Sequence, residues 1–301
     1  KDSPEPAAEE RSPLAPAGWR VLWKSDPATQ ATISWNTPRA GEYHAVHLAT
    51  KLDDGQLPED AVVVECQRNG EYTASSRDVG QLHYHHARLR DLKPDTVYYF
   101  AMESDGRRSP ILHFRTMTDQ DRPFELLFGG DSRSDRDSRQ QVNRMIGRLV
   151  GERPDLVAFA HGGDYIATGS SLQQWREWME DHELTASDDR RMLPLIPARG
   201  NHDRGALFHE VFDYPEEDGI YFAFDLGPAC RFITLNTETS TAGDQKDWLE
   251  EELEESRPEH RWVVAQYHKP AWPAVKSASS AKQHWVPLFE RFNVDLVCEA
   301  D

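Results

Sequence analysis

The chain has 301 residues, and its 34 lysines and arginines against 52 aspartates and glutamates give a formal net charge of −18. Hydrophobic residues make up 38% of the chain, enough for the cores of two ordinary domains, so a disordered or fibrous protein is excluded. The acidic balance argues against a protein that coats nucleic acid, because a phosphate backbone requires a basic surface. No apolar stretch approaches the roughly 20 residues that a membrane-spanning helix needs, so no membrane span is expected.

Residues 1–18 form a polar lead-in rich in proline, alanine and glutamate, without the apolar run of a signal peptide. Either such a peptide has been removed or there was none. A flexible acidic segment suits a mature exported protein, so we expect a secreted or periplasmic location. The cysteines Cys66, Cys230 and Cys298 are far apart and form no CxxC pair, which argues against a zinc knuckle or a disulfide framework.

Residues 19–118 contain short β-branched and aromatic runs separated by proline, glycine, asparagine and aspartate. Strands are predicted at 31–35, 43–49 and 97–103. Their spacing predicts an antiparallel sandwich of about 100 residues. Residues 92–116 resemble the end of a fibronectin type III-like domain, and residues 119–124 have the composition of a linker.

From residue 125 onward, apolar strands alternate with amphipathic helices, which predicts a layered α/β domain over 125–301. In the expected helix at 244–256, Trp248, Leu249 and Leu253 lie at helical spacing among acidic residues. A second helix is expected at 139–150. Strands are expected in the segments 125–131, 155–164, 193–203, 231–237, 261–268 and 294–301.

Polar residues able to bind metal follow four of these strands directly: Asp131, Asp164, the run Asn201-His202-Asp203, and His268. The carboxyl ends of strands in an α/β sheet are where ligand crevices form. Glycines beside these residues allow tight turns and a close approach of the backbone to a ligand. Each polar residue alone could be a helix cap or a turn residue. The ordered set favours a ligand-binding edge.

The motifs GD at 130–131, GGD at 162–164, GNHD at 200–203 and YH at 267–268 resemble, in this order, those of the calcineurin-like metallophosphoesterase superfamily. The whole chain resembles its purple acid phosphatase-like members, which begin with a fibronectin type III-like domain. The resemblance implies an N-terminal all-β sandwich plus a C-terminal α/β metallophosphoesterase four-layer sandwich.

The resemblance also implies a dinuclear metal site that hydrolyses a phosphomonoester or phosphodiester. Asp131 would bind the first metal ion, Asp164 would bridge both, and Asn201 and His268 would bind the second. A metal-bound hydroxide would attack, and His202 would protonate the leaving alkoxide as general acid. Oxygen and imidazole ligands without thiolates suit Zn, Mn or Fe. The expected partner is a phosphorylated small molecule or a diester.

Two positions depart from the family pattern. Many members have a histidine where this chain has Arg133, and purple acid phosphatases have a tyrosine where it has Ala167. The first metal ion would then be under-coordinated or completed by water or another residue, and no tyrosinate colour is expected. Arg133 would either clamp the substrate phosphate or pair with an acid such as Asp135 or Asp137.

A third departure is that the family completes its site with a GHxH motif directly after an apolar strand. Residues 294–301 look like that strand, and the sequence stops at Asp301. We therefore expect a metallophosphoesterase domain that is truncated at its carboxyl end. The alternative is a natural protein that lacks these histidines.

Two rival functions remain open from the sequence. Arg133 favours a catalytically inactive binding protein, and a diesterase for nucleotides, cyclic nucleotides or phospholipids would keep the chemistry but change the substrate. The substrate pocket is expected to be walled by residues 165–192 and 269–284. His161 and the HYHH segment at 83–86 are interpreted as packed structural residues rather than metal ligands.

Overall fold

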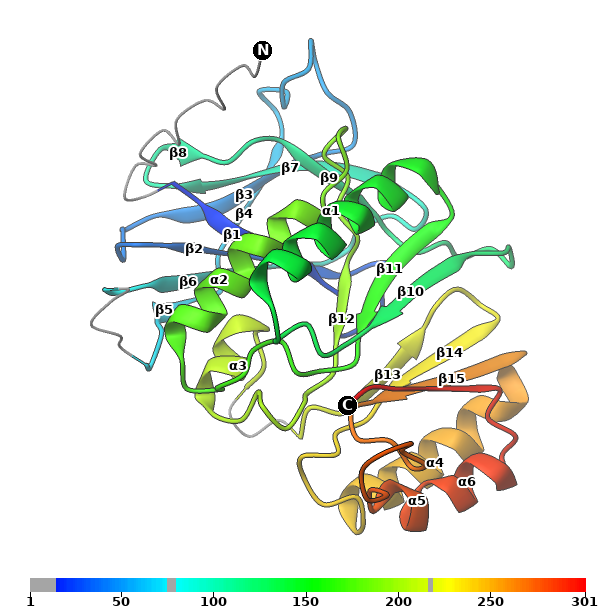
Figure 1. Cartoon of the computed structure of the whole chain (residues 1–301). Coiled ribbons are helices and arrows are strands. Elements are labelled where there is room, and N and C mark those ends of the chain that lie inside the picture. Colours follow the sequence, from blue (N-terminus) through cyan, green and yellow to red (C-terminus); the bar gives the residue numbers. More distant parts are fainter. Residues whose placement is uncertain (1–14, 75–79, 216–218) are drawn as a thin grey trace, which may run out of the picture.

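The computed structural model describes residues 15–74, 80–215 and 219–301, so most of the lead-in predicted over 1–18 lies outside the described residues. The chain builds an all-β half first and an α/β half second (Figure 1). The strands are β1 (Ala17–Leu22), β2 (Ala31–Thr37), β3 (His44–Ala49), β4 (Val62–Glu65), β5 (Arg68–Glu71), β6 (His83–Leu89), β7 (Val97–Ser104), β8 (Arg107–Arg108), β9 (Leu112–Arg115), β10 (Glu125–Gly129), β11 (Leu156–His161), β12 (Leu195–Pro197), β13 (Phe222–Asp225), β14 (Cys230–Thr234), β15 (Trp262–Tyr267) and β16 (Leu296–Glu299). The helices are α1 (Arg136–Glu152), α2 (Leu172–His182), the short 3-10 helix η1 (Glu183–Thr185), α3 (Ala206–Val211), α4 (Asp244–Glu259), α5 (Ala281–His284) and α6 (Val286–Arg291).

The all-β half is the predicted antiparallel sandwich. One layer runs β1-β2-β6-β5, and the other runs β4-β3-β7 with β8 and β9 both paired to β7. Trp35 of the first layer and Phe100 of the second are fully buried in one core, because alternate residues of each strand point between the layers. The strands predicted at 31–35, 43–49 and 97–103 are confirmed as β2, β3 and β7.

The two halves share a sheet, which the sequence pattern did not indicate. Strand β1 pairs with β2 on one side and runs parallel to β12 on the other, with Leu22 opposite Leu195. The result is a seven-stranded sheet in the order β10-β11-β12-β1-β2-β6-β5. The first strand of the chain therefore fixes the sandwich to the α/β half.

The α/β half has four layers. Within the first sheet, Leu126 and Phe128 of β10 pack toward the second sheet, where they meet the cluster that contains Phe232. Leu127, which points the opposite way, packs against the cluster that contains Ile146 of α1. Figure 1 shows α1 and α2 on the outer side of the first sheet and α4, α5 and α6 on the outer side of the second. The order is helix, sheet, sheet, helix, as the family resemblance implies.

Helix α4 confirms the amphipathic segment predicted at 244–256. Leu249 and Leu253 are fully buried against Ile233 and Val263 of the second sheet, while Glu251 between them is exposed. The second sheet has the order β13-β14-β15-β16, and β14, β15 and β16 run parallel. Their carboxyl ends therefore lie along one edge, next to the carboxyl ends of β10 and β11.

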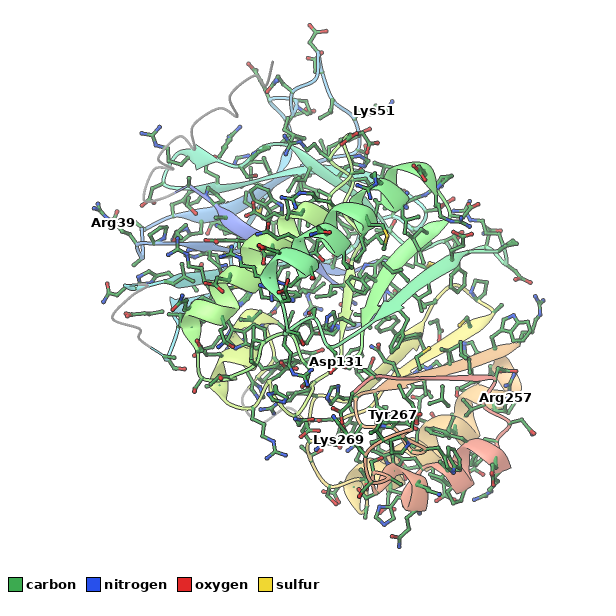
Figure 2. The ribbon with its side chains drawn as sticks, in the orientation of Figure 1. Arg39, Lys51, Asp131, Arg257, Tyr267 and Lys269 are labelled. Atoms are coloured by element: carbon green, nitrogen blue, oxygen red, sulfur yellow. The ribbon has the colours of Figure 1, made fainter. Side chains whose placement is uncertain are left out.

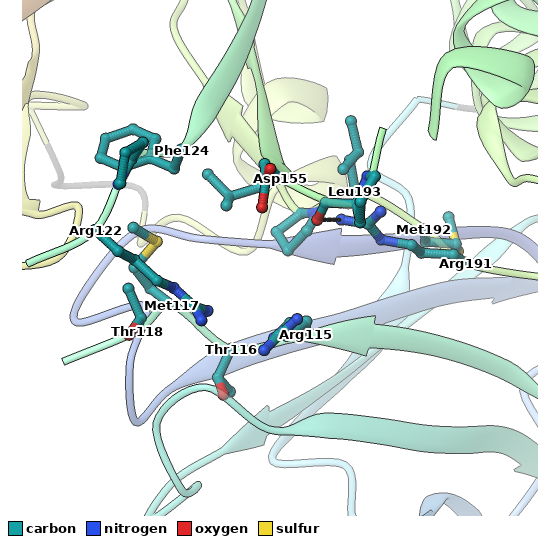
Figure 3. A pocket seen from close by; sticks show the side chains of 14 residues that line it. Arg115, Thr116, Met117, Thr118, Arg122, Phe124, Asp155, Arg191, Met192 and Leu193 are labelled. Carbon is teal, nitrogen blue, oxygen red and sulfur yellow. Dashed lines mark hydrogen bonds between the residues drawn. The ribbon is translucent and has the colours of Figure 1, made fainter. Parts of the chain in front are cut away.

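A pocket lies at the junction of the two halves, away from that edge (Figure 3). Its arginines already have partners. Arg115 and Arg122 both pair with Asp95, and Arg191 donates hydrogen bonds to backbone carbonyls, including that of Pro154 at 3.2 Å. The pocket therefore offers a ligand no unpaired arginine. The lining segments are residues 115–118, 122–124, 154–155, 157 and 191–194.

Candidate metal centre

Four side chains meet at the seam between the two sheets of the α/β half. Asp131 follows β10, Asp164 follows β11, His268 follows β15 and Asp301 follows β16. Each offers one ligand atom, and these atoms all lie within 4.8 Å of one another. Among the residues that the structure describes, this is the single group of three or more such side chains that could hold a metal ion. Figure 2 shows Asp131 close to this seam, whereas Arg39 and Lys51 lie far away on the all-β half.

The turns that carry Asp131 and Asp164 share one backbone feature. Both residues adopt a left-handed conformation, with φ of +53° and +59°, which aspartate adopts more readily than most non-glycine residues. The turn of Asp164 also packs directly against the GNHD turn. A Cβ atom added to Gly200 would lie 2.3 Å from the backbone nitrogen of Asp164, so only glycine fits there.

Asp164 is the buried centre of the cluster, with a side chain that is 0% exposed. Its Oδ1 accepts the backbone N–H of His202 at 2.9 Å. Its Oδ2 makes no hydrogen bond, and Arg133 Nη1 lies 3.4 Å from it. Burial alone would raise the pKa of Asp164, but contacts with His268 and the His202 N–H hold this pKa below its usual value. A buried carboxylate with an oxygen that lacks a hydrogen bond fits a bound cation.

The Nε2 atom of His268 faces the carboxylate of Asp164. Its Nδ1 lies 2.8 Å from the Gly162 carbonyl oxygen, which can only accept, so Nδ1 carries the proton. This arrangement leaves Nε2 for the cluster, 3.3 Å from Asp164 Oδ1 and 3.2 Å from Asn201 Oδ1. Burial favours the neutral ring, but Asp164 and the Gly162 carbonyl raise the pKa of His268.

Asn201 and His202, which the sequence placed in the site, lie beside the cluster. The Asn201 amide oxygen faces His268, as described above. The His202 ring is about one-third exposed and holds the Ala167 carbonyl through Nδ1 at 2.7 Å. Its Nε2 lies 3.9 Å from Asp164 Oδ2. The imidazole therefore stands at the solvent side of the carboxylates, within reach of a bound ligand.

Arg133 pairs with the cluster itself. Its Nη1 donates to Asp131 Oδ1 at 2.5 Å, whereas Asp135 accepts the Ser138 N–H as the N-cap of α1. The acid that Arg133 pairs with is therefore Asp131, which the sequence analysis had not named for it, and not Asp135.

The structure adds Asp301 to the site and shows what Asp203 does in it. Asp301 donates its backbone N–H to Asp131 Oδ2 at 2.7 Å, and its side chain is 6% exposed. The signal for Asp301 was present, because it follows a strand as Asp131 does. Asp203 accepts the N–H groups of Gly200, Asp164 and Tyr165, and burial raises its pKa to about 7. It belongs to the GNHD motif, but its role is visible only in three dimensions.

The histidines interpreted as structural are packed. His161 stacks on Tyr165 with ring centroids 3.9 Å apart, and burial lowers its pKa to about 3. In the HYHH segment, His85 bonds Thr37 and Asn69 within the sandwich, 2.8 Å from each. Neither histidine belongs to the metal-ligand group found among the described residues.

Family models match both halves. Residues 16–116 match the model "Purple acid Phosphatase, N-terminal domain", and residues 112–301 match "Calcineurin-like phosphoesterase". The chain belongs to the calcineurin-like phosphoesterase family. The family is metal-dependent, and this chain presents a cluster of possible metal ligands. None of its described helices is long and apolar enough to cross a membrane.

Relatives of this chain come from bacteria and plants. An uncharacterised Mycobacterium tuberculosis protein is 24% identical over 93% of this chain and 60% of its own length. Purple acid phosphatase 13 of Arabidopsis thaliana is 26% identical over 71% of this chain and 48% of its own. This chain thus spans 60% or less of the length of these two relatives.

Solved structures show the same fold. Purple acid phosphatase PPD1 from yellow lupin seeds superposes with a TM-score of 0.74 at 16% identity, covering 95% of this chain and 58% of that one. The structure of PhoD superposes with a TM-score of 0.62 at 12% identity, covering 97% and 72%. At this level of identity the likeness concerns the fold alone.

Proposed function

We propose that the protein hydrolyses a phosphomonoester or a phosphodiester with the help of two bound metal ions, drawn from Zn, Mn and Fe. The observation that carries the proposal is the convergence of Asp131, Asp164 and His268 at one seam, with Asn201 beside them. The donor set of carboxylate and amide oxygens and one imidazole suits these ions. Asp164 would bridge the two ions, Asp131 would bind the first, and Asn201 and His268 the second.

Bound cations would supply charge neutralisation for the phosphoryl group and activate a water molecule for attack. His202 would hold the proton for the leaving oxygen at Nε2, because its Nδ1 is held by the Ala167 carbonyl. Arg133 Nη1 contacts the carboxylates of both Asp131 and Asp164. Once a cation binds those carboxylates, Arg133 would donate to a substrate phosphate oxygen.

Hydrolysis of nitrophenyl phosphate by the purified protein, in the presence of Mn, Zn or Fe, tests this proposal. We expect turnover that falls at least about 100-fold in His202→Ala, a typical loss for a general acid, and that disappears in Asp164→Asn. His47→Ala is the matched control, because His47 lies on β3 and pairs with Glu103 far from the seam. Absence of bound metal and of turnover across several divalent ions would reject the proposal.

A catalytically inactive binding protein is the second candidate. The contact of Arg133 with Asp131 favours it, because the guanidinium competes with a cation for that carboxylate. A relative from Arabidopsis thaliana carries the name "Probable inactive purple acid phosphatase 27" and is 24% identical over 52% of this chain. Metal analysis separates the two candidates, since the inactive protein would hold no stoichiometric metal.

A comparison of two substrates tests whether the protein hydrolyses monoesters or diesters. Rates with mono-nitrophenyl phosphate and bis-nitrophenyl phosphate distinguish a monoesterase from a diesterase for nucleotides, cyclic nucleotides or phospholipids. A preference for the bis ester of tenfold or more, about 1.4 kcal/mol in transition-state free energy, would assign the diesterase.

We also propose that the protein is secreted or periplasmic. The support is the polar, proline-rich composition of residues 1–18. Fractionation of the source cells with an antibody against the protein tests this, and recovery with cytoplasmic markers would contradict it.

A further inference from the structure

Asp301 shares the geometry of the two aspartates that the sequence placed in the site. It follows β16, and its φ of +63° lies beside the +53° of Asp131 and the +59° of Asp164. The backbone of the preceding Ala300 donates to the His268 carbonyl at 3.1 Å, which holds the end of β16 against that of β15. Three strands from two sheets thus each deliver a carboxylate to one point.

The negative charges of these three carboxylates favour a cation bound between them. Three carboxylates within this volume repel one another unless positive charge lies between them. Arg133 contacts Asp131, and Lys276, whose side chain is about half exposed, contacts Asp301 from the rim. Arg133 Nη1 lies 3.4 Å from the buried Oδ2 atom of Asp164, but neither cation makes a hydrogen bond to that atom. That atom points to a further ligand at the centre of the group.

We infer that Asp301 is a metal ligand and that it biases the site toward hard, oxygen-preferring divalent ions such as Mn²⁺. This inference rests on the proposed metal-dependent function. With Asp301, the donors among the described residues include three carboxylates, the Asn201 amide oxygen and the His268 imidazole. Carboxylate and carbonyl oxygens suit Mn²⁺ and Mg²⁺, whereas added imidazole shifts a site toward Zn²⁺. The Lys276 ammonium competes with the metal ion for the Asp301 carboxylate.

Titration of the metal-free protein with Mn²⁺ and with Zn²⁺, by calorimetry and by Mn²⁺ electron paramagnetic resonance, tests the inference without an activity assay. We expect Asp301→Asn to weaken Mn²⁺ binding by tenfold or more, since even residues that only support a ligand change affinity about 10- to 100-fold. Asp301→His should raise the ratio of Zn²⁺ to Mn²⁺ affinity. Lys276→Met should strengthen Mn²⁺ binding, because it frees the carboxylate.

The opposite changes in Mn²⁺ affinity expected for Asp301→Asn and Lys276→Met distinguish a metal ligand from a structural ion pair. If Asp301 served only to pair with Lys276, Asp301→Asn and Lys276→Met would break the same contact and change metal affinity alike. Asp295→Asn is the control, because Asp295 lies just before β16 and bonds Arg257 and the Val263 N–H instead of the cluster.

Unchanged Mn²⁺ affinity in Asp301→Asn, or an equal loss in Lys276→Met, would overturn the inference. Metal binding that depends on Asp301 in a protein that hydrolyses no phosphoester would overturn the proposed function and leave the inference standing. A wild-type protein that binds neither ion would overturn both. Where Asp301→Asn fails to fold, Lys276→Met and Asp301→His still decide, by the direction of their effects.

Discussion

Asp203 is the residue that ties the two central turns of the site together. Its carboxylate accepts the Gly200 N–H at 2.8 Å within its own turn and the Asp164 N–H at 2.7 Å from the turn after β11. It is fully buried and touches no ligand atom of the cluster in these contacts. Its effect on the site therefore acts through the positions of Asp164 and Asn201.

We predict that Asp203→Asn weakens metal binding about 10- to 100-fold, as loss of residues that orient ligands does. An amide in this position has one acceptor oxygen and directs an NH₂ group at backbone donors, which should also lower the free energy of unfolding by about 1–3 kcal/mol. Calorimetric metal titration and urea unfolding measure the two effects. Asp137→Asn, an exposed residue in the first turn of α1, should change neither, and equal metal affinity in both variants would contradict the positioning role.

At the scale of the elements, the site depends on turns that approach closer than side chains allow. The backbone nitrogen of Gly200 would lie 2.5 Å from a Cβ atom on Gly163, and a Cβ on Gly200 would meet Asp164 Oδ1 at 2.2 Å. The loops after β11 and β12 are therefore in direct backbone contact. This contact places Asn201 next to Asp164.

We predict that Gly200→Ala displaces Asp164, abolishes metal binding and destabilises the fold by about 1–3 kcal/mol, the range for overpacking a buried position. Gly151→Ala is the matched control within α1, where an added Cβ would lie 3.5 Å from Ser187 Cβ in ordinary contact. Alanine in a helix should be neutral or stabilise by up to about 1 kcal/mol. Metal titration and thermal unfolding of both variants check this, and a Gly200→Ala protein that binds metal normally would be the contrary result.

At the scale of the whole molecule, buried histidines connect stability to pH. Burial lowers the pKa of His85 to about 2 and those of His86, His161 and His182 to about 3. These residues come from both the sandwich and the α/β half. In the unfolded chain their pKa values return to about 6.5. Above pH 6.5 both states are neutral, and below it the unfolded state alone takes up protons.

We therefore predict that the free energy of unfolding falls as pH drops from 6.5 toward 3, by about 1 kcal/mol per histidine at pH 5.5. Thermal unfolding followed by circular dichroism between pH 7.5 and 5 measures the change. His182→Phe should make the free energy of unfolding less dependent on pH, because it removes one of the four titrating histidines. The phenyl ring should fit, because the His182 Nε2 makes no hydrogen bond and the ring stacks on Trp178. An unfolding midpoint that does not change with pH over this range would contradict the prediction.

The connection between the halves is also a property of the whole molecule. Asp213, from the α/β half, is almost fully buried and bonds Arg88 of β6 at 2.7 Å, with Lys24 at 3.5 Å. Burial opposes ionisation, but these cations hold the pKa of Asp213 well below its usual range. Together with the β1–β12 pairing, this ion-pair group joins segments far apart in the sequence.

Local chemistry allowed much of the fold to be predicted. Apolar runs predicted β10, β11, β14 and β15, because burial on both faces requires continuous hydrophobic residues. The four residues Asp131, Asp164, Asn201 and His268 were identified because polar side chains directly after such strands stand out. The parallel pairing of β1 with β12 left no such pattern, since it joins segments more than 170 residues apart.

The amino-acid sequence by itself determined most strands of the α/β half and the polar residues that end four of them, because strand formation and turn chemistry depend on neighbours along the chain. Only the tertiary structure decided that Asp301 joins the cluster, that Arg133 pairs with Asp131 and that Asp203 holds two turns. The contacts of Asp203 and Asp301 join residues that follow different strands, whereas Arg133 and Asp131 lie two residues apart in one turn. The position of Asp301 depends on how the two sheets pack against each other, and no local pattern of residues encodes that packing.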